Sequence, residues 1–371
     1  MERLRVIFVF SSAMNVAAAC QADALVRAWQ EDAEVDASTV RLSRSSPTAW
    51  PALLRRLAGA DVIHVLPASA HRGLSHTIPV LALARVIGRP AIVSYGDVPG
   101  AGDVCDSPVL RRALGAATGQ VVPSDVMADA LERLGNRATV IPPLVEPETF
   151  PFRERHPFRP RLLSVRDFEP CDNVAATIRA FAVVQHRWSG ATLTLVGRGS
   201  QEQHLRALAD NLALRRVMFA GPVETVDLPA VYADHDLFIQ SANVDNGATA
   251  LLRAFAAGLP VVSTTAGAVP SILTHGVNGL LAPLADYQTL GHHVLRLISS
   301  PDYARGLART AHAACDAYRW PRVREQWLRT YRRVVARPAR PRRSPLTARI
   351  FGPVSLAGGE RGESATERRA S

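Results

Sequence analysis

Short apolar runs and amphipathic stretches alternate along most of the chain. The runs are rich in Val, Ile and Leu and are bounded by polar residues, which is typical of strands buried on both faces of a parallel sheet. The stretches between them repeat apolar residues at three and four positions, which predicts helices. Such an alternation predicts an α/β protein built from βαβ units. The expected strands are Arg5–Phe10, Thr39–Leu42, Asp61–Leu66, Ala91–Tyr95, Gln120–Pro123, Ala138–Pro142, Arg161–Val165, Ala191–Val196, Val217–Ala220, Leu237–Gln240 and Pro260–Thr264, and the expected helices are Ala18–Gln30, Trp50–Leu57, Ile78–Ile87, Val126–Leu134, Val174–Val184, Gln201–Leu212, Ala248–Ala257, Asp286–Leu297, Asp302–Tyr318 and Trp320–Val335.

A change of composition at Pro147–Pro160 divides this pattern. The stretch is rich in Pro, Arg, Phe and Glu and has no period, which is typical of a linker. Trp320–Val335 carries apolar residues on one stripe and arginines on the other, which predicts a terminal amphipathic helix. From Pro338 onward the sequence is polar and aperiodic, which indicates disorder. The predicted parts are a domain at residues 1–148, a linker at 149–160, a second domain at 161–319, the terminal helix at 320–337 and a tail at 338–371.

One stretch, Asp236–Gly279, adds groups that can bind a ligand. The expected strand Leu237–Gln240 is followed by the polar loop Ser241–Gly247 and by a helix that Gly258 ends as a C-cap. In a parallel sheet the loop after a strand lies at the carboxyl edge, where ligands bind. The loop therefore brings Asp245 and the free N–H groups of the helix start to one crevice, which suits an anionic, hydroxyl-rich ligand.

The same stretch resembles the donor-binding segment of retaining nucleotide-sugar glycosyltransferases of the GT-B fold, in the family 4-like group named glycosyl transferases group 1. The matching segments are LLRAFAAGLPVVSTTAGAVPSI and HGVNGLLAP. Members of that family carry two Glu separated by seven residues, and here Asp245 and Arg253 stand at these positions. The resemblance implies two Rossmann-like doubly wound domains that face an interdomain cleft. It also implies an acceptor-binding first domain, a donor-binding second domain and a C-terminal helix that crosses back to the first.

The resemblance assigns the groups of the donor to particular residues. Asp245 stands where a catalytic carboxylate addresses the donor sugar, and Arg166 matches an Arg that grips the diphosphate, which a guanidinium can do by a forked contact. The turn Gly197–Gly199 follows an expected parallel strand and permits close approach of a ligand. The expected donor contacts are Arg166, Gly197, Arg198, Gly199, Asn246, Gly247, Ala248, Thr249 and Arg253.

Four positions depart from the family pattern. The first loop, SSAMNVAAAC, lacks the Gly-Gly of the family. The loop SYGDVPGAGD lacks the histidine that the family places beside the reacting sugar. Either Asp97 or Asp103 substitutes for this histidine, or the loop is an ordinary turn. The Lys that completes the diphosphate clamp is replaced by Cys171 or Asp172. Arg253 cannot accept hydrogen bonds from ribose as Glu does, so it either faces a phosphate or points to solvent.

These observations leave two main functions open. The first is a glycosyltransferase that moves a sugar from an NDP-sugar to an acceptor hydroxyl group with retention, in cell-envelope or exopolysaccharide synthesis. The second is a catalytically impaired GT-B module that binds a sugar nucleotide or partners an active glycosyltransferase. The resemblance implies a glycan or lipid-linked acceptor and no metal or other cofactor. The oligomeric state is not predicted.

The basic residues narrow the range of partners. All 43 are arginine and the net charge is +10, so chemistry that needs a lysine is excluded. The arginines are spread out with no basic stripe interleaved by aromatic residues, so nucleic acid is the weakest hypothesis. The arginine face of the terminal helix is either solvated or in peripheral contact with anionic lipid.

Cysteine usage and apolar length indicate the compartment. Cys20, Cys105, Cys171 and Cys315 have no Cys-x-x-Cys spacing, which favours a reducing compartment over a disulfide framework or zinc site. No apolar run reaches the roughly 20 residues of a spanning helix. The apolar run Val6–Phe10 is shorter than the ~7–15 residues of a signal peptide. We therefore expect a cytoplasmic protein, either free or peripherally bound at the inner face of the membrane. His64, in the middle of an expected strand, is interpreted as a packing residue in preference to a catalytic one.

Overall fold

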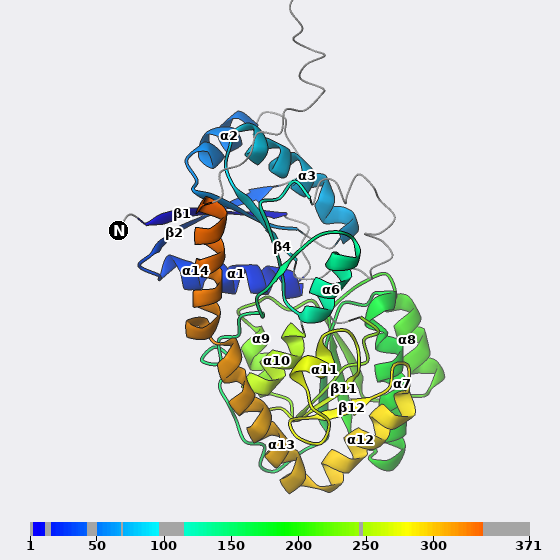
Figure 1. Ribbon diagram of the computed structural model, residues 1–371. Helices are drawn as coiled ribbons and strands as arrows, with labels where there is room; N and C mark the ends of the chain where they lie inside the picture. Colours follow the sequence, from blue (N-terminus) through cyan, green and yellow to red (C-terminus); the bar gives the residue numbers. More distant parts are fainter. Residues whose placement is uncertain are drawn as a thin grey trace, which may run out of the picture. The chain divides into compact units, whose positions relative to one another are not determined.

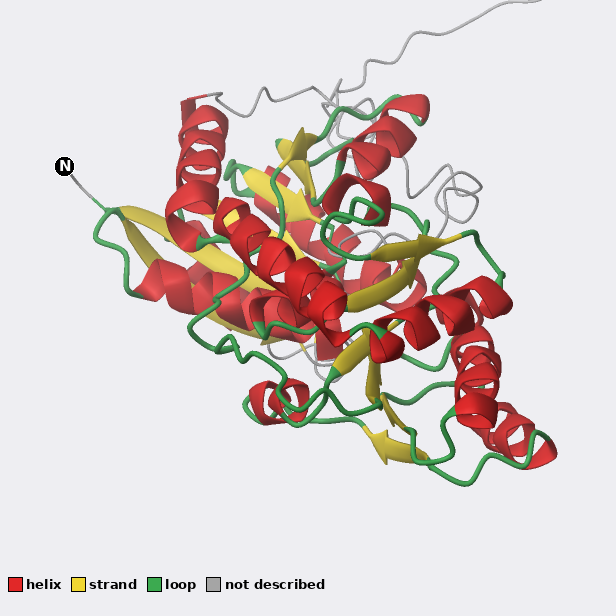
Figure 2. Cartoon of the chain, turned by 90° about the horizontal axis from the view of Figure 1, so that it is seen from below, coloured by secondary structure: helices red, strands yellow, loops and turns green. Residues whose placement is uncertain are grey.

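Two parallel sheets of six strands each form the frame of the part of the chain that the computed structural model describes (Figure 1). The described residues are 3–11, 16–42, 50–67, 70–95, 115–244 and 248–336. Both sheets belong to one compact unit of the chain, Met1–Ala339. Helices and strands alternate along the sequence, which confirms the predicted α/β class. Figure 2 shows the helices in red and the strands in yellow.

The first sheet has the strand order β2-β1-β3-β4-β5-β6, and every neighbouring pair is parallel. The order reverses between β1 and β3, because β2 lies on one side of β1 and the later strands lie on the other. The carboxyl ends of the strands at such a point leave a crevice in which α/β proteins bind ligands. The elements of this half are β1 (Leu4–Ser11), α1 (Val16–Gln30), β2 (Val35–Leu42), α2 (Trp50–Ala58), β3 (Val62–Leu66), α3 (Ala70–Val86), β4 (Ala91–Ser94), β5 (Gly119–Val122), α6 (Asp125–Arg133) and β6 (Thr139–Val140).

The second sheet has the order β12-β11-β10-β7-β8-β9, again with parallel neighbours only. It reverses between β7 and β10, which is the strand order of a doubly wound dinucleotide-binding sheet. Its elements are β7 (Arg161–Val165), the 3-10 helix η2 (Pro170–Asp172), α7 (Val174–Arg187), β8 (Thr192–Val196), α8 (Glu202–Asn211), β9 (Val217–Gly221), α9 (Leu228–Ala233), β10 (Leu237–Ile239), α10 (Thr249–Ala256), β11 (Val261–Thr264), α11 (Val269–Ile272), β12 (Leu280–Ala282), α12 (Tyr287–Ser299), α13 (Pro301–Ala314) and the 3-10 helix η3 (Cys315–Tyr318).

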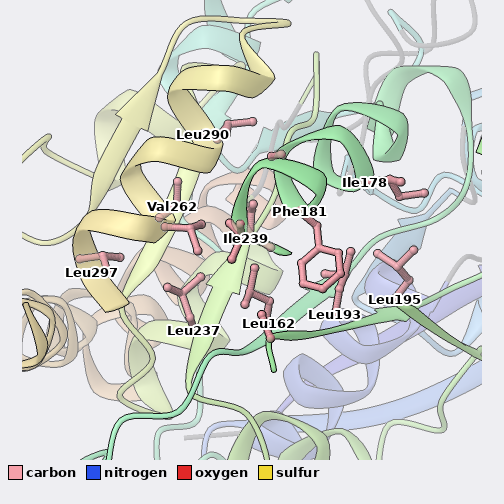
Figure 3. Close-up of a cluster of buried hydrophobic side chains, with 14 of the residues drawn as sticks. Leu162, Ile178, Phe181, Leu193, Leu195, Leu237, Ile239, Val262, Leu290 and Leu297 are labelled. Carbon is pink, nitrogen blue, oxygen red and sulfur yellow. The ribbon is translucent and has the colours of Figure 1, made fainter. Parts of the chain in front are cut away.

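Apolar side chains cover both faces of the second sheet. Leu162 of β7 belongs to the cluster in Figure 3, where side chains of α7 and α12 meet those of the strands. The next residue, Leu163, belongs to a second cluster that includes Leu251 and Phe255 of α10. Because side chains of a strand alternate between its faces, one strand serves both clusters. This double burial explains why these strands read as continuous apolar runs.

The last described helix, α14 (Trp320–Ala336), packs against the first sheet although it follows the second in sequence (Figure 1). Its Tyr331 lies in the same buried cluster as Phe8 of β1. Nη2 of Arg324 donates hydrogen bonds to Oδ1 of Asp32 over 3.1 Å and to Oε1 of Glu34 over 2.8 Å. The predicted crossing of a C-terminal helix back to the first half is therefore confirmed.

Residues 149–160 contain no helix or strand, and they are firmly attached to the second half. Arg155 is only 2% exposed. Its guanidinium donates to the backbone carbonyl groups of Tyr232 and His235 over 3.0 Å and 3.1 Å, and also to that of Ala257. Because backbone carbonyl groups satisfy this buried cation, it needs no carboxylate partner.

Most expected elements agree with the structure to within a few residues, and β7 agrees at both ends. The periodicity does not predict β12, α9 or α11, because these elements are only three, six and four residues long. Strand β2 begins at Val35, four residues before its expected start, because its whole length pairs with β1. The predicted tail, residues 338–371, lies outside the described residues.

Candidate functional site

Arg166 follows β7 and Gln240 follows β10, so both lie where the second sheet reverses its strand order. Nη2 and Nε of Arg166 donate hydrogen bonds to Oε1 of Gln240 over 2.9 Å and 3.3 Å. Nε2 of the fully buried Gln240 donates in turn to Oγ of Ser263 over 2.9 Å. The amide therefore orients the guanidinium at the crevice where such sheets bind ligands. The Arg166 side chain remains 15% exposed and is accessible from solvent.

A carboxylate lies beside Arg166 where the family resemblance implies a second cation. Oδ1 of Asp172, the last residue of η2, is 3.7 Å from Nη1 of Arg166, and the Asp172 side chain is only 13% exposed. Its neighbour Cys171 is exposed. Low exposure weakens the screening of such a charge pair by solvent. An anion that binds to Arg166 must therefore compete with Asp172.

The glycines of the Gly197–Gly199 turn are required by a neighbouring loop. Gly197 has φ +144°, and a Cβ atom there would lie 1.9 Å from the carbonyl oxygen of Arg166. A Cβ atom at Gly199 would lie 2.5 Å from the carbonyl oxygen of Phe168. The backbone N–H of Phe168 donates to the carbonyl of Arg198 over 2.9 Å, and the Arg198 side chain is exposed. The turn thus supports the backbone of Arg166, and its contact with a donor stays a prediction.

Helix α10 starts without a capping side chain from its own N-cap residue. Ala248, the N-cap residue, has φ +46° and an alanine side chain that carries no acceptor for the first turn. The N–H groups of a first helical turn have no acceptor within their own helix and form its positive end. Thr249 therefore opens a helix that suits an anion. Asp245, Asn246 and Gly247 lie outside the described residues, so their roles stay predictions.

Arg253 is buried, which argues against one of its two expected alternatives, that its side chain points to solvent. It is 6% exposed, and its Cζ lies 5.7 Å from the centroid of the Phe150 ring. Among the described residues no carboxylate forms an ion pair with it. Arg253 lies four positions after Thr249, so both residues are on one face of α10. Sequence reasoning missed Phe150, whose only signal was an aromatic residue in a linker rich in proline.

Two absences concern the described part of the chain alone. Its His, Cys, Asp and Glu residues form no group of three that could hold a metal ion. The prediction that the protein needs no metal stays a prediction. No helix in the described ranges combines the length and the apolar character that crossing a membrane requires. Asp97, Asp103 and the loop after β1 lie outside these ranges.

Comparison with known sequences gives a match to one family. Residues 159–300 match the model described as Glycosyl transferases group 1. Over 234 residues the chain is 27% identical to the phosphatidyl-myo-inositol mannosyltransferase of Mycobacterium leprae. The aligned residues cover 61% of this chain and 62% of the relative. Over 195 residues it is 29% identical to the exopolysaccharide phosphotransferase SCO2592 of Streptomyces coelicolor. These residues cover 50% of this chain and 21% of the relative. The chain thus spans less than two thirds of the length of these curated relatives.

Comparison with solved structures confirms the fold. The chain is similar to Alr3699/HepE of Anabaena, which was solved in complex with UDP and glucose. The TM-score is 0.71 at 17% identity, over 89% of this chain and 100% of that chain. At this identity the likeness shows the architecture alone. The predicted GT-B fold, with two parallel-sheet α/β halves, is therefore confirmed.

Proposed function

Because residues 159–300 are a Glycosyl transferases group 1 domain and the chain has the GT-B fold, we propose that the protein is a glycosyltransferase. Its donor is a nucleotide sugar, and its reaction moves the sugar to an acceptor hydroxyl group with retention of configuration. The UDP and glucose bound to the Anabaena neighbour support a donor of this class. No metal or other cofactor is needed in this proposal.

The orientation of Arg166 is the observation that carries the proposal. Negative charge grows on the diphosphate as its bond to the sugar breaks and the bond to the acceptor oxygen forms. A cation that is already oriented stabilises this charge without reorganisation, and one such donor is worth roughly 2.7–4 kcal/mol. Gln240 holds the Arg166 guanidinium in place, and the positive end of α10, at Thr249, offers a second anion-binding element.

The remaining donor contacts follow from the order of the segments. We assign the donor sugar to Asp245, which follows β10, and to the amide groups of Asn246, Gly247 and Ala248. Arg253, on the same helix face as Thr249, is assigned to the nucleotide. A guanidinium donates hydrogen bonds and accepts none, so its proposed contact is a phosphate.

The pairing of Asp172 with Arg166 supports a second candidate function. A carboxylate 3.7 Å from the guanidinium offsets the charge that the leaving diphosphate needs. A module of this kind binds a sugar nucleotide, or partners an active glycosyltransferase, without turning over the donor itself.

The named relatives guide the choice of acceptor. One is a mannosyltransferase named for phosphatidyl-myo-inositol, and another is named for exopolysaccharide. We therefore propose a glycan or lipid-linked acceptor in cell-envelope or exopolysaccharide synthesis. The arginine side of α14 is the proposed place of peripheral contact with anionic lipid at the inner face of the membrane.

A panel experiment separates the two candidates. The full chain is incubated with UDP-sugars and GDP-sugars, with and without alkyl glycoside acceptors, and both nucleotide binding and nucleoside diphosphate release are measured. Release that increases with an acceptor supports the transferase. Binding without release supports the impaired module. A protein that neither binds nor releases any of the nucleotides contradicts both.

A further inference from the structure

Two histidine side chains close the outer edge of β12. In the described part of the chain β12 is an end strand of the second sheet, and its neighbour is β11. The backbone N–H of Leu281 in β12 donates a hydrogen bond to Nδ1 of His275 over 3.0 Å. The carbonyl oxygen of Leu281 lies 3.1 Å from Nε2 of His293 on α12, which packs beside β12 (Figure 1). Both backbone groups of Leu281 therefore have an imidazole as their partner in place of a further strand.

The two hydrogen bonds determine the tautomers of the two rings. A backbone N–H only donates, so Nδ1 of His275 accepts through its lone pair, and the proton of the neutral ring is on Nε2. A carbonyl oxygen only accepts, so Nε2 of His293 carries the proton that it donates. His293 can keep its bond to Leu281 in either charge state. His275 keeps its bond only while its ring is neutral.

The surroundings of the two rings favour His275 as the ring that takes up a proton first. The ring centroids are 5.3 Å apart, so two charged rings would repel each other. Burial lowers the pKa of the half-buried His293, although its bond to Leu281 raises it. The neighbouring basic groups lower the pKa of His293 further; they are His275, Arg296 and His292. His275 is exposed to the solvent that supplies the proton.

The other titratable groups around the pair do not neutralise it. In the described ranges neither histidine forms an ion pair with a carboxylate. The carboxylate of Asp286, which precedes α12, accepts from the backbone N–H and the hydroxyl group of Thr289 over 2.9 Å and 2.7 Å. On α13 the group that faces the turn is Tyr303, whose hydroxyl oxygen would lie 3.8 Å from a Cβ atom at Gly276. The guanidinium of Arg296 covers the ring of Tyr303.

The turn that carries His275 has a second set of hydrogen bonds, which does not titrate. Oδ1 of Asn278 accepts from the N–H of Thr274 over 2.7 Å, and Nδ2 of Asn278 donates to the carbonyl of Ile272 over 3.0 Å. The N–H of Gly276 also donates to the carbonyl of Gly279 over 2.8 Å. Loss of the His275 bond therefore opens the strand edge while the turn stays folded.

We propose that His275 is a pH-sensitive latch on the outer edge of β12. In acid a proton from the solvent binds to Nδ1, the hydrogen bond from Leu281 breaks, and the N–H of Leu281 donates to water instead. A strand edge with a free N–H is able to pair with another strand. Protonation thus exposes an edge that the neutral protein keeps closed. This inference is independent of the proposed function, because the outer edge of β12 is separate from the crevice beside Arg166.

Amide hydrogen exchange of Leu281 tests the inference. The full chain is labelled with ¹⁵N-leucine, and the amide signal of Leu281 is identified by its loss in Leu281→Ile. Exchange is followed by NMR at pH 7.5 and pH 5.5, with each rate corrected for the effect of pH on chemical exchange. We expect the protection of Leu281 to fall at pH 5.5 by about fivefold to tenfold more than it does in His275→Asn, since one net hydrogen bond is lost.

The variant His275→Asn separates the latch from any general effect of acid. Its amide does not titrate, and any change in global stability with pH that does not arise at His275 is common to both proteins. His204→Asn, at an exposed position of α8, is the matched control and is expected to retain the full fall. An equal fall in wild type and His275→Asn, or a fall that His204→Asn abolishes, would overturn the inference.

A second measurement uses the ring of His275 itself. A two-bond ¹H–¹⁵N spectrum at pH 7.5 distinguishes the two neutral tautomers, and the signals of His275 are identified by their loss in His275→Asn. We expect the proton on Nε2, because Nδ1 accepts from Leu281. A neutral ring with its proton on Nδ1 would show that the latch does not exist.

Discussion

The carboxyl edges of the two sheets share an architecture but differ in chemistry. At the second sheet a guanidinium, Arg166, lies between the amide of Gln240 and the carboxylate of Asp172. At the first sheet Ser94 and Tyr95 line a cavity whose described lining residues are all uncharged. The strand order places a crevice at each edge. The few residues after each strand then decide whether that crevice suits an anion or an apolar group.

The largest expected effect comes from a substitution in the Gly197–Gly199 turn, which packs against the backbone of Arg166 at the second sheet. Gly197→Ala places a Cβ atom 1.9 Å from the carbonyl oxygen of Arg166, at a φ of +144° that side chains rarely adopt. We expect a loss of at least about 4 kcal/mol in the free energy of unfolding, measured by chemical denaturation. Gly306→Ala is the control, because nothing lies within 4 Å of its Cβ position in α13. It should stabilise the protein by about 0.5–1 kcal/mol. Equal stability of the two variants would contradict this account of the turn.

The next effect concerns the charge itself. Arg166→Gln removes the oriented cation, and we expect kcat/KM for the nucleotide-sugar donor to fall by about 100-fold to 1000-fold. Arg179→Gln, at an exposed position of α7, is expected to retain full activity. If the two variants were equally active, Arg166 would not act on the leaving group.

At the first sheet, His64 makes the stability of the protein depend on pH. The pKa of His64 is lowered from 6.5 to about 3 by burial. Below pH 6.5 the unfolded chain takes up a proton at His64 that the folded chain does not, so stability is lost as the pH falls from 6.5 towards 3. Between pH 7 and pH 5 this group alone should cost about 2 kcal/mol of unfolding free energy. Urea denaturation of the wild type and of His64→Gln at both pH values measures it. Parallel pH profiles would show that His64 is protonated in the folded protein.

The smallest effect concerns the carboxylate beside Arg166. Asp172→Asn removes the competing charge but keeps the shape of the side chain. We expect UDP to bind about threefold to tenfold more tightly, measured by calorimetry, since a partly buried charge pair contributes about 1 kcal/mol. Asp210→Asn, on the exposed end of α8, is the control. Weaker UDP binding in Asp172→Asn would mean that the carboxylate supports the site rather than opposes it.

The sequence predicted the frame of the protein because strands buried on both faces leave strong apolar runs. Strand β7 coincides with its expected range, and Arg166 directly after it could therefore be placed at the sheet edge. Gly258, expected to end α10, has φ +73° as a C-terminal glycine requires. Each of these features depends on residues close together in sequence.

The features that escaped prediction depend on residues far apart in sequence. The burial of Arg253 against Phe150 joins residues 103 positions apart, so helical periodicity contains no sign of it. The bonds of His64 to Ser94 and Tyr331 join three separate elements. The glycines of the Gly197–Gly199 turn were predicted to let a ligand approach closely. The loop that packs on them is visible only in the fold.

The most direct measurement is a crystal structure of the full chain with UDP bound. We expect the diphosphate to lie at the carboxyl edge of the second sheet, with one of its oxygen atoms about 2.7–3.2 Å from a guanidinium nitrogen of Arg166. A diphosphate bound elsewhere, with none of its oxygen atoms within hydrogen-bond distance of Arg166, would contradict this expectation.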